Sequence, residues 1–365
     1  MKKIFWIAGE VSGDLHAGMI LKKLDKKYIN YGIGGDFMQK EGFTPLYDFH
    51  KFSVMGFIEV LKNIGFFIRV KKEIEAHLAN EKPDLVILVD YPGLNMRIAK
   101  AAKMLGIPVI FYIAPQFWAW KYKRVYDLKK FTDITAVIFP FEDKILKSED
   151  VNSKFVGHPI AEEISVSLDK ENFAKKFELD INKKWITFFP GSRINEVKRM
   201  LPVFEKAINL LENHEFIISQ SPNLADKYFK NIKNAKVVKG YNYELMKYSF
   251  AMSITSGTAT LEVSYIGTPF LIAYKTTKTS YMIGKYFIKT KWIGLPNIVL
   301  SKSAVKELIQ DDANEQNIAA ELNNLINNIQ YRNKMKSDFE KIKKMLGTKS
   351  ASDEMKKIIS GFLDE

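Results

Sequence analysis

The chain has 365 residues, 47% of them hydrophobic and 27% charged, which is typical of a soluble globular protein long enough for two domains. It contains no cysteine, which excludes disulfides and thiolate metal sites, and its five histidines show no metal-ligand spacing. The formal charge of +13 predicts a polyanionic partner, namely nucleic acid, an anionic membrane surface or a phosphorylated small molecule.

The N-terminal segment predicts a buried strand over residues 3–8, then a glycine turn and a helix that ends near Leu24. The apolar run is too short for an export signal, and no run of about 18 apolar residues that would span a bilayer follows. The two glycines allow a ligand to approach the backbone, and Glu10, Asp14 and His16 are candidate proton acceptors. A capped strand–helix turn with solvated acids is the alternative.

An unusually aromatic and aliphatic segment covers residues 54–68 and has basic residues close by. This mixture suits an amphipathic element that dips into a lipid interface while its bases meet anionic headgroups. The alternative is ordinary core packing, and the two differ in whether the phenylalanines are exposed. The candidate membrane or acyl-chain contacts are Met55, Phe57, Ile58, Leu61, Phe66 and Phe67.

The clearest parallel-strand pattern covers residues 83–90 and ends at Asp90. Ligands gather at the carboxyl ends of strands in doubly wound sheets, so Asp90 is a candidate site residue. A strand at 107–113 leads into an aromatic and basic cluster at 114–124, which suits stacking on single-stranded nucleic acid or a sugar or acyl pocket. Another strand is expected at 134–139.

The strand–turn–helix pattern starts again at residues 184–189. The turn Pro190–Arg193 precedes an amphipathic helix, in which Pro202 is expected to mark a break or restart. An arginine at such a turn is well placed to neutralise a diphosphate, and a surface salt bridge is the alternative.

A similar turn follows the strand expected at 250–254. Ser256 and Gly257 suit a helix N-cap, where free backbone N–H groups and the helix dipole hold an anion. Glu262 lies one or two turns further in, where its carboxylate would accept hydrogen bonds from sugar hydroxyls. An ordinary capped helix is the alternative. A strand at 268–274 and a loop at 292–297 follow.

These patterns predict an α/β protein with two Rossmann-like doubly wound domains that face each other across a cleft. The first domain is expected over 1–165, with a C-terminal helix at 348–365 that packs back on it, and the second over 166–347.

The motifs together resemble the lipid-A-disaccharide synthase family, which has the glycosyltransferase-B fold. They occur in the family's order and spread over most of the chain. The matching segments are residues 8–16, 118–125, 155–159, 190–197, 256–262 and 295–297.

The resemblance implies an inverting transfer of 2,3-diacylglucosamine from its UDP derivative to 2,3-diacylglucosamine 1-phosphate. The products would be UDP and a β-1,6-linked tetraacyl disaccharide 1-phosphate, a precursor of lipid A in the Gram-negative outer membrane. The resemblance implies no metal or other cofactor, a cytoplasmic enzyme held peripherally at the inner membrane, and leaves a homodimer open. It assigns UDP binding to Gly191, Ser192, Arg193, Ser256, Gly257, Thr258, Glu262 and Asn297.

One departure from the family concerns the general base. Many members carry a second acid where this chain has Gly93, so the base is left among Asp90, Asp14 and His16, with Glu10 nearby. Asp90 is our first choice. The alternatives are another enzyme of this fold that uses UDP-N-acetylglucosamine, either a transferase or a 2-epimerase, and, from a different class, a nucleic-acid-binding protein.

Overall fold

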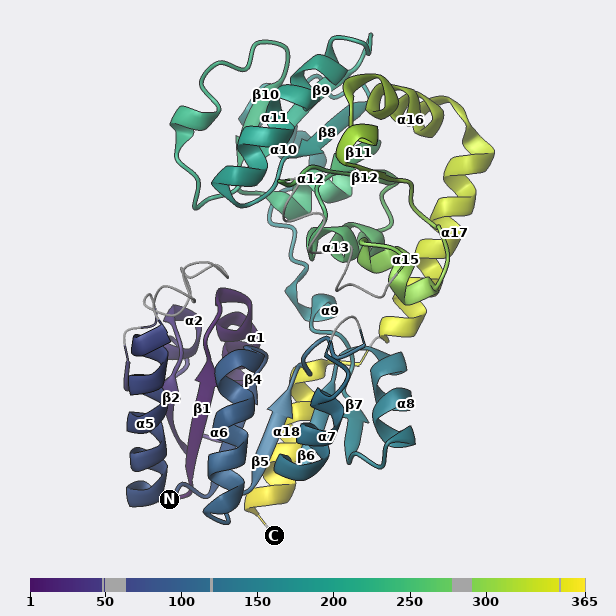
Figure 1. Ribbon diagram of the computed structural model, residues 1–365. Coiled ribbons are helices and arrows are strands. Elements are labelled where there is room, and N and C mark those ends of the chain that lie inside the picture. The colour runs from purple at the N-terminus through teal and green to yellow at the C-terminus, as the bar shows by residue number, and fades with distance from the viewer. Residues whose placement is uncertain (48, 50–63, 119–120, 278–290, 348, 365) are drawn as a thin grey trace. The chain divides into compact units, whose positions relative to one another are not determined.

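A computed structural model describes residues 1–47, 49, 64–118, 121–277, 291–347 and 349–364. The chain divides into two units, residues 1–161 with 346–365, and residues 162–345 (Figure 1). Within the described residues, no helix is long and apolar enough to cross a membrane.

The first unit contains a seven-stranded sheet in the order β3-β2-β1-β4-β5-β6-β7, and all of its strands pair in parallel. The central strands are almost wholly buried, as continuous apolar runs predict for a parallel sheet covered on both faces. The strands are β1 (Lys3–Ala8), β2 (Ile29–Ile33), β3 (Thr44–Pro45), β4 (Leu85–Val89), β5 (Val109–Tyr112), β6 (Ile134–Val137) and β7 (Ser153–Phe155).

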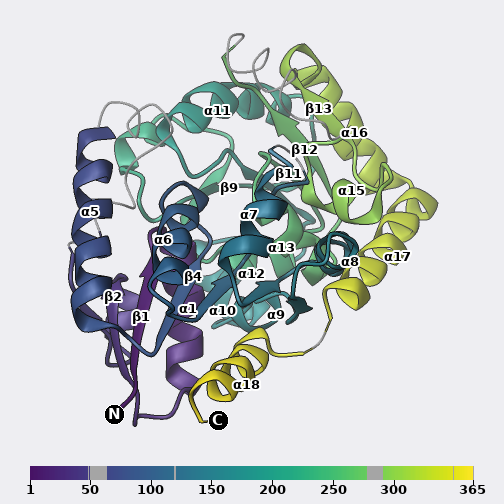
Figure 2. The same ribbon diagram turned by 60° about the horizontal axis from the view of Figure 1, so that its bottom comes forward.

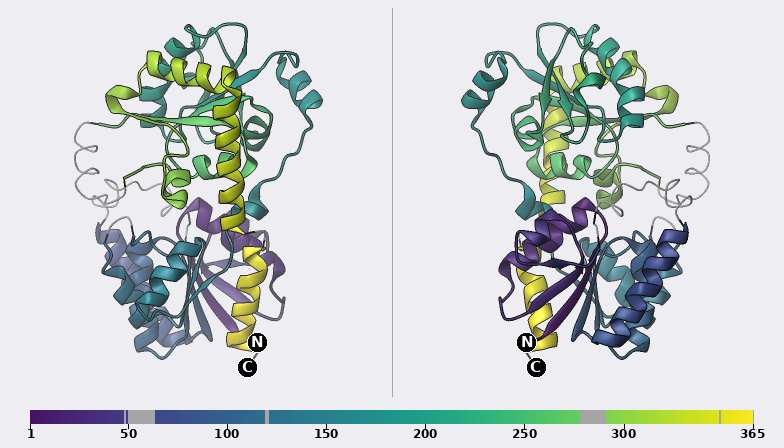
Figure 3. Two further views of the ribbon diagram at one scale, coloured as in Figure 1. Left: turned by 90° about the vertical axis from the view of Figure 1, so that its right-hand side faces the viewer. Right: turned by 90° about the vertical axis from the view of Figure 1, so that its left-hand side faces the viewer.

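Helices cover both faces of this sheet (Figure 3). One face carries α1 (Val11–Lys23) and α18 (Ala351–Leu363), and the other carries α5 (Ile64–Glu81) and α6 (Pro92–Met104). The remaining helices are α2 (Asp36–Gln39), α7 (Arg124–Phe131) and α8 (Pro140–Ser148), and α9 (Ile160–Glu163) spans the boundary between the two units along the chain.

The last helix, α18, belongs to the first unit although it ends the chain (Figure 2). Lys23 joins α1 to the start of α18, because its Nζ lies 2.6 Å from Ser350 Oγ and 3.0 Å from Asp353 Oδ2. Met355 and Ile359 of α18 are fully buried.

The second unit contains a six-stranded parallel sheet in the order β10-β9-β8-β11-β12-β13. Its strands are β8 (Trp185–Phe189), β9 (Glu215–Gln220), β10 (Lys236–Lys239), β11 (Ala251–Ile254), β12 (Phe270–Tyr274) and β13 (Glu307–Ile309). The prediction of two Rossmann-like α/β domains is confirmed by the two sheets.

The helices of the second unit form two groups of neighbours. Helices α11 and α16 contact each other, and α16 lies on β11 and β12, whereas α10, α12, α13 and α15 contact one another in succession. Their bounds are α10 (Lys170–Phe177), α11 (Ile194–Ile208), α12 (Asn242–Tyr248), α13 (Ala259–Ile266), α15 (Leu295–Leu300), α16 (Glu315–Asn327) and α17 (Ile329–Leu346), with 3-10 turns η1 (Asp226–Tyr228) and η2 (Gln310–Asp312).

Two local predictions in this unit were wrong. Helix α11 runs through Pro202 without a break. Pro202 is exposed, as is Lys198, so water can reach the Lys198 carbonyl that receives no N–H from the proline. The expected loop at 292–297 instead starts helix α15 at Leu295, with Pro296 in the first turn, where a proline is well tolerated.

Both sheets have a topological switch point, where the strand order changes direction along the sheet. It lies between β1 and β4 in the first unit and between β8 and β11 in the second. Ligands of doubly wound folds bind at the carboxyl ends of the strands beside such a point. The turns singled out in the sequence directly follow these four strands, at residues 9, 90, 190 and 255 onward.

Candidate active site

Asp90 lies at the switch point of the first unit, directly after β4. Asp90 and Tyr91 both adopt left-handed backbone conformations with φ of +47°, which is uncommon for residues other than glycine. Such a turn persists only when its surroundings fix it, and it occurs preferentially at functional sites.

Asn95 holds this turn in place. Its side chain is fully buried, and its Nδ2 donates to the carbonyl of Asp90 at 2.8 Å and to that of Val89 at 3.2 Å. Gly9, at the end of β1, makes room for the Tyr91 ring, because a Cβ at Gly9 would lie 2.7 Å from that ring. The residues that follow β1 and β4 therefore pack directly against each other.

The surroundings of Asp90 make its carboxyl a weaker acid than an ordinary aspartate. Burial raises the pKa of the Asp90 carboxyl to about 6, and the charge of Glu10 adds to this effect. The backbone N–H of Tyr91 and the positive charges of His16 and Arg124 act in the opposite direction on this pKa. The structure thus brings Asp90, Glu10 and His16 within electrostatic range of one another, and it adds Arg124. A carboxyl with a pKa near neutrality can act as a general base.

Asp14, by contrast, is used inside the fold. It is buried, and its carboxylate accepts backbone N–H groups from Gly35 at 2.8 Å, Phe37 at 3.0 Å and Met38 at 3.1 Å. It therefore holds the N-terminal turn of α2, a task for which a carboxylate is well suited. These bonds leave little capacity for a proton from a substrate, so we no longer favour Asp14 as a base.

Two further titratable groups that the sequence had not marked as site residues belong to these surroundings: Glu142 lies within electrostatic range of Asp90, and His158 within electrostatic range of His16. Glu142 is buried, and its carboxyl accepts Nε1–H of Trp118 at 2.9 Å and N–H of Phe139 at 3.3 Å. Burial raises the pKa of Glu142 to about 8, with a smaller contribution from Asp90. Burial lowers the pKa of His158 to about 3, with a contribution from His16. The sequence feature that could have marked Glu142 is its position: it is the third residue of a helix that begins with Pro140, where a Glu commonly caps the helix N-terminus.

The turn before α11 carries Arg193 at the switch point of the second unit. Gly191 has a φ of +110°, and a Cβ there would lie 2.4 Å from Oε2 of Glu196. The Glu196 carboxylate accepts N–H of Ser192 at 3.2 Å and lies 3.1 Å from Nη1 of Arg193. The Arg193 side chain is nevertheless 81% exposed, so its guanidinium can also reach a ligand.

The second turn at this switch point follows β11. The N-cap position of helix α13 is Thr258 rather than Ser256 or Gly257 as expected, and the Thr258 side chain makes no capping hydrogen bond. Within the described residues, the backbone N–H groups of Gly257 and Thr258 have no acceptor in the protein. Both residues are exposed, so these N–H groups can bind an anion at the helix N-terminus.

Glu262 lies in the first turn of α13. Burial raises its pKa to about 7, and the charge of Glu163 adds to this effect. Burial also raises the pKa of Tyr243, with contributions from Glu262 and Glu163. A carboxyl with a pKa near 7 can donate a hydrogen bond to a sugar hydroxyl or accept one from it near neutral pH.

Asn297 has no exposed surface, and its side chain is fully hydrogen-bonded within the protein. Its Oδ1 accepts N–H of Ala304 and Val305 at 2.8 and 2.9 Å. Its Nδ2 donates to the Val305 carbonyl at 2.9 Å and to Oε1 of Glu307 at 2.8 Å. An amide offers four such positions, so no side-chain bond of Asn297 remains for a ligand.

The candidate membrane contacts are only partly described. Met55, Phe57, Ile58 and Leu61 lie outside the described residues. Phe66 and Phe67, in the first turn of α5, are half-buried and pack against the core of the first unit. Their rings lie 5.4 Å apart, and the Phe67 ring lies 6.5 Å from that of Tyr91.

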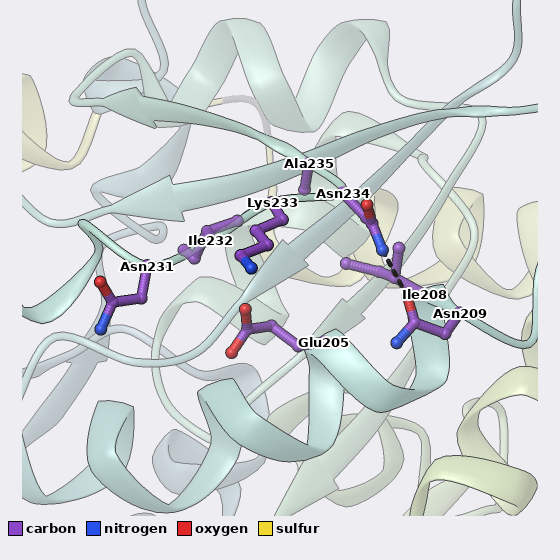
Figure 4. Close-up of a pocket in the computed structure, with 8 residues that line it drawn as sticks. All are labelled: Glu205, Ile208, Asn209, Asn231, Ile232, Lys233, Asn234 and Ala235. Carbon is purple, nitrogen blue, oxygen red and sulfur yellow. Dashed lines mark hydrogen bonds between the residues drawn. The ribbon is translucent and has the colours of Figure 1, made fainter.

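A pocket on the second unit lies away from these turns (Figure 4). It is formed by the C-terminal end of α11 and the segment before β10, and Nδ2 of Asn234 lies 2.6 Å from Oδ1 of Asn209. Because α11 starts at the carboxyl edge of the sheet, its other end lies toward the opposite edge. The lining residues are Glu205, Ile208, Asn209, Asn231, Ile232, Lys233, Asn234 and Ala235.

Comparisons with solved structures show the fold alone. The chain superposes on a Staphylococcus aureus MnaA–UDP structure with a TM-score of 0.67 at 16% identity, covering 100% of this chain and 97% of that one. It also matches a UDP-GlcNAc 2-epimerase from Neisseria meningitidis bound to UDP-GlcNAc, with a TM-score of 0.63, 15% identity and full coverage of both chains. A glycotransferase of kitacinnamycin gives 0.65 at 12% identity and 99% coverage of both chains.

Sequence comparisons identify the family. Residues 4–360 match the family model described as lipid-A-disaccharide synthetase. Curated lipid-A-disaccharide synthases are 34% identical in Trichlorobacter lovleyi, covering 100% of this chain and 98% of that protein, and 34% identical in Coxiella burnetii, covering 99% of both. The relative from Geobacter sulfurreducens is 35% identical and covers 98% of this chain and 96% of that protein. The chain therefore belongs to the lipid-A-disaccharide synthase family.

Proposed function

We propose that the protein is a glycosyltransferase that moves 2,3-diacylglucosamine from UDP-2,3-diacylglucosamine to the 6-hydroxyl of 2,3-diacylglucosamine 1-phosphate. The products are UDP and a β-1,6-linked tetraacyl disaccharide 1-phosphate. Family membership supports the reaction class. The observation that carries the chemistry is the half-buried Asp90 on a strained turn at the switch point of the first unit.

Asp90 is the general base of this proposal. The acceptor hydroxyl loses its proton to Asp90 as its oxygen forms a bond to C1 of the donor sugar, and the bond from C1 to UDP breaks with inversion. A pKa of about 6 leaves Asp90 mostly ionised at neutral pH, yet more basic than an ordinary aspartate. Gly93 carries no acid, and Asp14 is occupied by three backbone bonds, which favours Asp90 among the candidates.

The second unit is proposed to bind the UDP part of the donor. Arg193 and the backbone N–H groups of Gly257 and Thr258 would hold the diphosphate, and they would stabilise the charge that UDP gains as it leaves. The exposed guanidinium and the two N–H groups, which have no acceptor among the residues that the structure describes, support this assignment. Glu262 is proposed to bind a sugar hydroxyl. Asn297 is proposed to act indirectly, by shaping the loop beside the nucleotide.

We further propose peripheral attachment to an anionic membrane, where both lipid substrates reside. The charge of +13 and the basic start of α5, where Arg69 and Lys72 are exposed beside the 45% exposed Ile68, support it. Co-sedimentation with vesicles containing anionic lipid, but not with neutral vesicles, is the expected result at low salt.

The decisive experiment measures UDP release from UDP-2,3-diacylglucosamine in mixed micelles, with and without 2,3-diacylglucosamine 1-phosphate. Release that requires the acceptor and yields a disaccharide is the expected outcome. Consumption of UDP-N-acetylglucosamine under the same conditions, with no disaccharide formed, would instead support a 2-epimerase or another transferase of this fold. Salt-sensitive RNA binding without UDP binding would contradict both.

A further inference from the structure

Glu307 connects three parts of the second unit, although no sequence motif marked it. Its carboxylate accepts the backbone N–H of Ile293 at 3.0 Å and of Gly294 at 2.9 Å. It also accepts Nδ2 of Asn297 at 2.8 Å. One carboxylate at the start of β13 therefore fixes both the residues before α15 and the buried amide inside α15.

The segment that Glu307 holds is closely packed against the sheet. A Cβ on Gly294 would lie 2.2 Å from Cδ1 of Ile272 and 3.1 Å from Oε1 of Glu307, so the backbone here is packed directly against β12 and β13. Asn297 adds two bonds to the residues before β13 through its Oδ1, to Ala304 and Val305. Hydrogen bonds therefore join the Ile293–Gly294 segment, helix α15 and strand β13 into one assembly.

This assembly reaches the turn proposed to hold the diphosphate. The hydroxyl of Ser256 donates to the Ile293 carbonyl at 3.2 Å. Ser256 directly precedes Gly257 and Thr258, whose N–H groups have no acceptor within the described residues. The Ile293 carbonyl therefore contacts the residue that directly precedes these two N–H groups.

We propose that Glu307 is a positioning residue of the nucleotide-diphosphate site, acting through the Ile293–Gly294 peptide and Ser256. Asn297 contributes to the same site through Glu307 rather than by contact with the nucleotide. This inference rests on the proposed function, because it takes the turn at Ser256 as the place where the donor diphosphate binds.

Glu307→Gln tests the proposal with little change in shape. The amide nitrogen of a glutamine cannot accept from a backbone N–H, so at least one bond to Ile293 or Gly294 is lost. Loss of a hydrogen bond to a charged group predicts a rise of about tenfold in the Kd for UDP and in the donor KM. The acceptor KM should change little, and the melting temperature should fall modestly, because an intramolecular hydrogen bond that stabilises the fold is lost. Asp311→Asn, an exposed acid four residues along the chain, is the matched control.

A double-mutant cycle tests the route through Ser256. If Glu307 acts by way of the Ser256 hydroxyl, Glu307→Gln should weaken UDP binding much less in a Ser256→Ala background than in the unmodified protein. Additive effects would overturn this route. A Glu307→Gln protein that binds UDP normally, or that loses donor and acceptor affinity together with thermal stability, would overturn the positioning role. If the unmodified protein binds no UDP while Asp311→Asn and Glu307→Gln remain folded, the nucleotide site itself is wrong, and this inference fails with it.

Discussion

At the residue scale, Asp90 is the group whose removal should affect chemistry most directly. Asp90→Asn keeps the size and the turn-forming character of the side chain but cannot take a proton. We expect turnover to fall at least about hundredfold, the typical contribution of a general base, with UDP affinity unchanged. In the unmodified enzyme the rate should fall as the pH drops below about 6, because the base becomes protonated. Near-normal turnover by a folded Asp90→Asn protein would rule out this role.

The same carboxyl should also reduce stability at neutral pH. Burial raises its pKa from an ordinary 3.8 to about 6, so the folded state binds the proton more tightly than the unfolded state. The resulting penalty is present above pH 6 and disappears as the pH falls below 3.8. It amounts to up to about 3 kcal/mol. Denaturation at pH 8 should therefore show Asp90→Asn to be at least as stable as the unmodified protein.

Arg193 offers a test of the leaving-group site. Arg193→Lys keeps the charge but removes the planar fork that matches a phosphate, so we expect the donor KM to rise about tenfold with the acceptor KM unchanged. Arg199→Lys, in the helix that Arg193 precedes, is the control. Equal effects of the two substitutions would argue against a specific role for Arg193. The measurement is steady-state kinetics with each substrate varied in turn.

At the scale of an element, Asp14 holds the first turn of α2. Asp14→Ala leaves three buried or half-buried N–H groups without their acceptor, and we expect the free energy of unfolding to fall by about 2–4 kcal/mol. Urea denaturation measures this. Glu10→Ala changes an exposed acid on the neighbouring turn and should alter stability by only about 0.5 kcal/mol. A stable Asp14→Ala protein without activity would return Asp14 to the candidate bases.

Pro202, inside helix α11, allows a second prediction about the stability of an element. A proline inside a helix costs about 3 kcal/mol, and its restriction of the unfolded chain returns up to about 1 kcal/mol. Pro202→Ala should therefore stabilise the protein by about 2 kcal/mol, because the carbonyl of Lys198 regains a donor. Lys206→Ala, on an exposed position of the same helix, should have little effect. Thermal denaturation of both variants would decide; a loss of stability in Pro202→Ala would contradict the argument.

At the scale of the whole molecule, the chain ends on the unit with which it begins. Helix α18 buries Met355, Ile359 and Leu363, and Asp364 accepts from the hydroxyl of Tyr28 at 2.8 Å. Removal of residues 350–365 would expose this apolar surface, and we expect an aggregation-prone protein with a lower melting temperature. Lys23→Ala removes only the polar contacts at the start of α18 and should be much milder. A truncated protein of normal stability would show that α18 is dispensable.

The sequence by itself determined the two doubly wound domains, most strand positions and the family, because apolar runs and glycine turns are local signals that recur in a fixed order. It also placed Asp90 and Arg193 at strand ends. Only the tertiary structure decided which polar groups are used internally. Asp14 and Asn297 are occupied by residues 21–24 and 7–10 positions away, and Glu142 pairs with Trp118. Burial and hydrogen-bond partners depend on segments that folding brings together, so a motif alone cannot distinguish a ligand contact from a positioning residue.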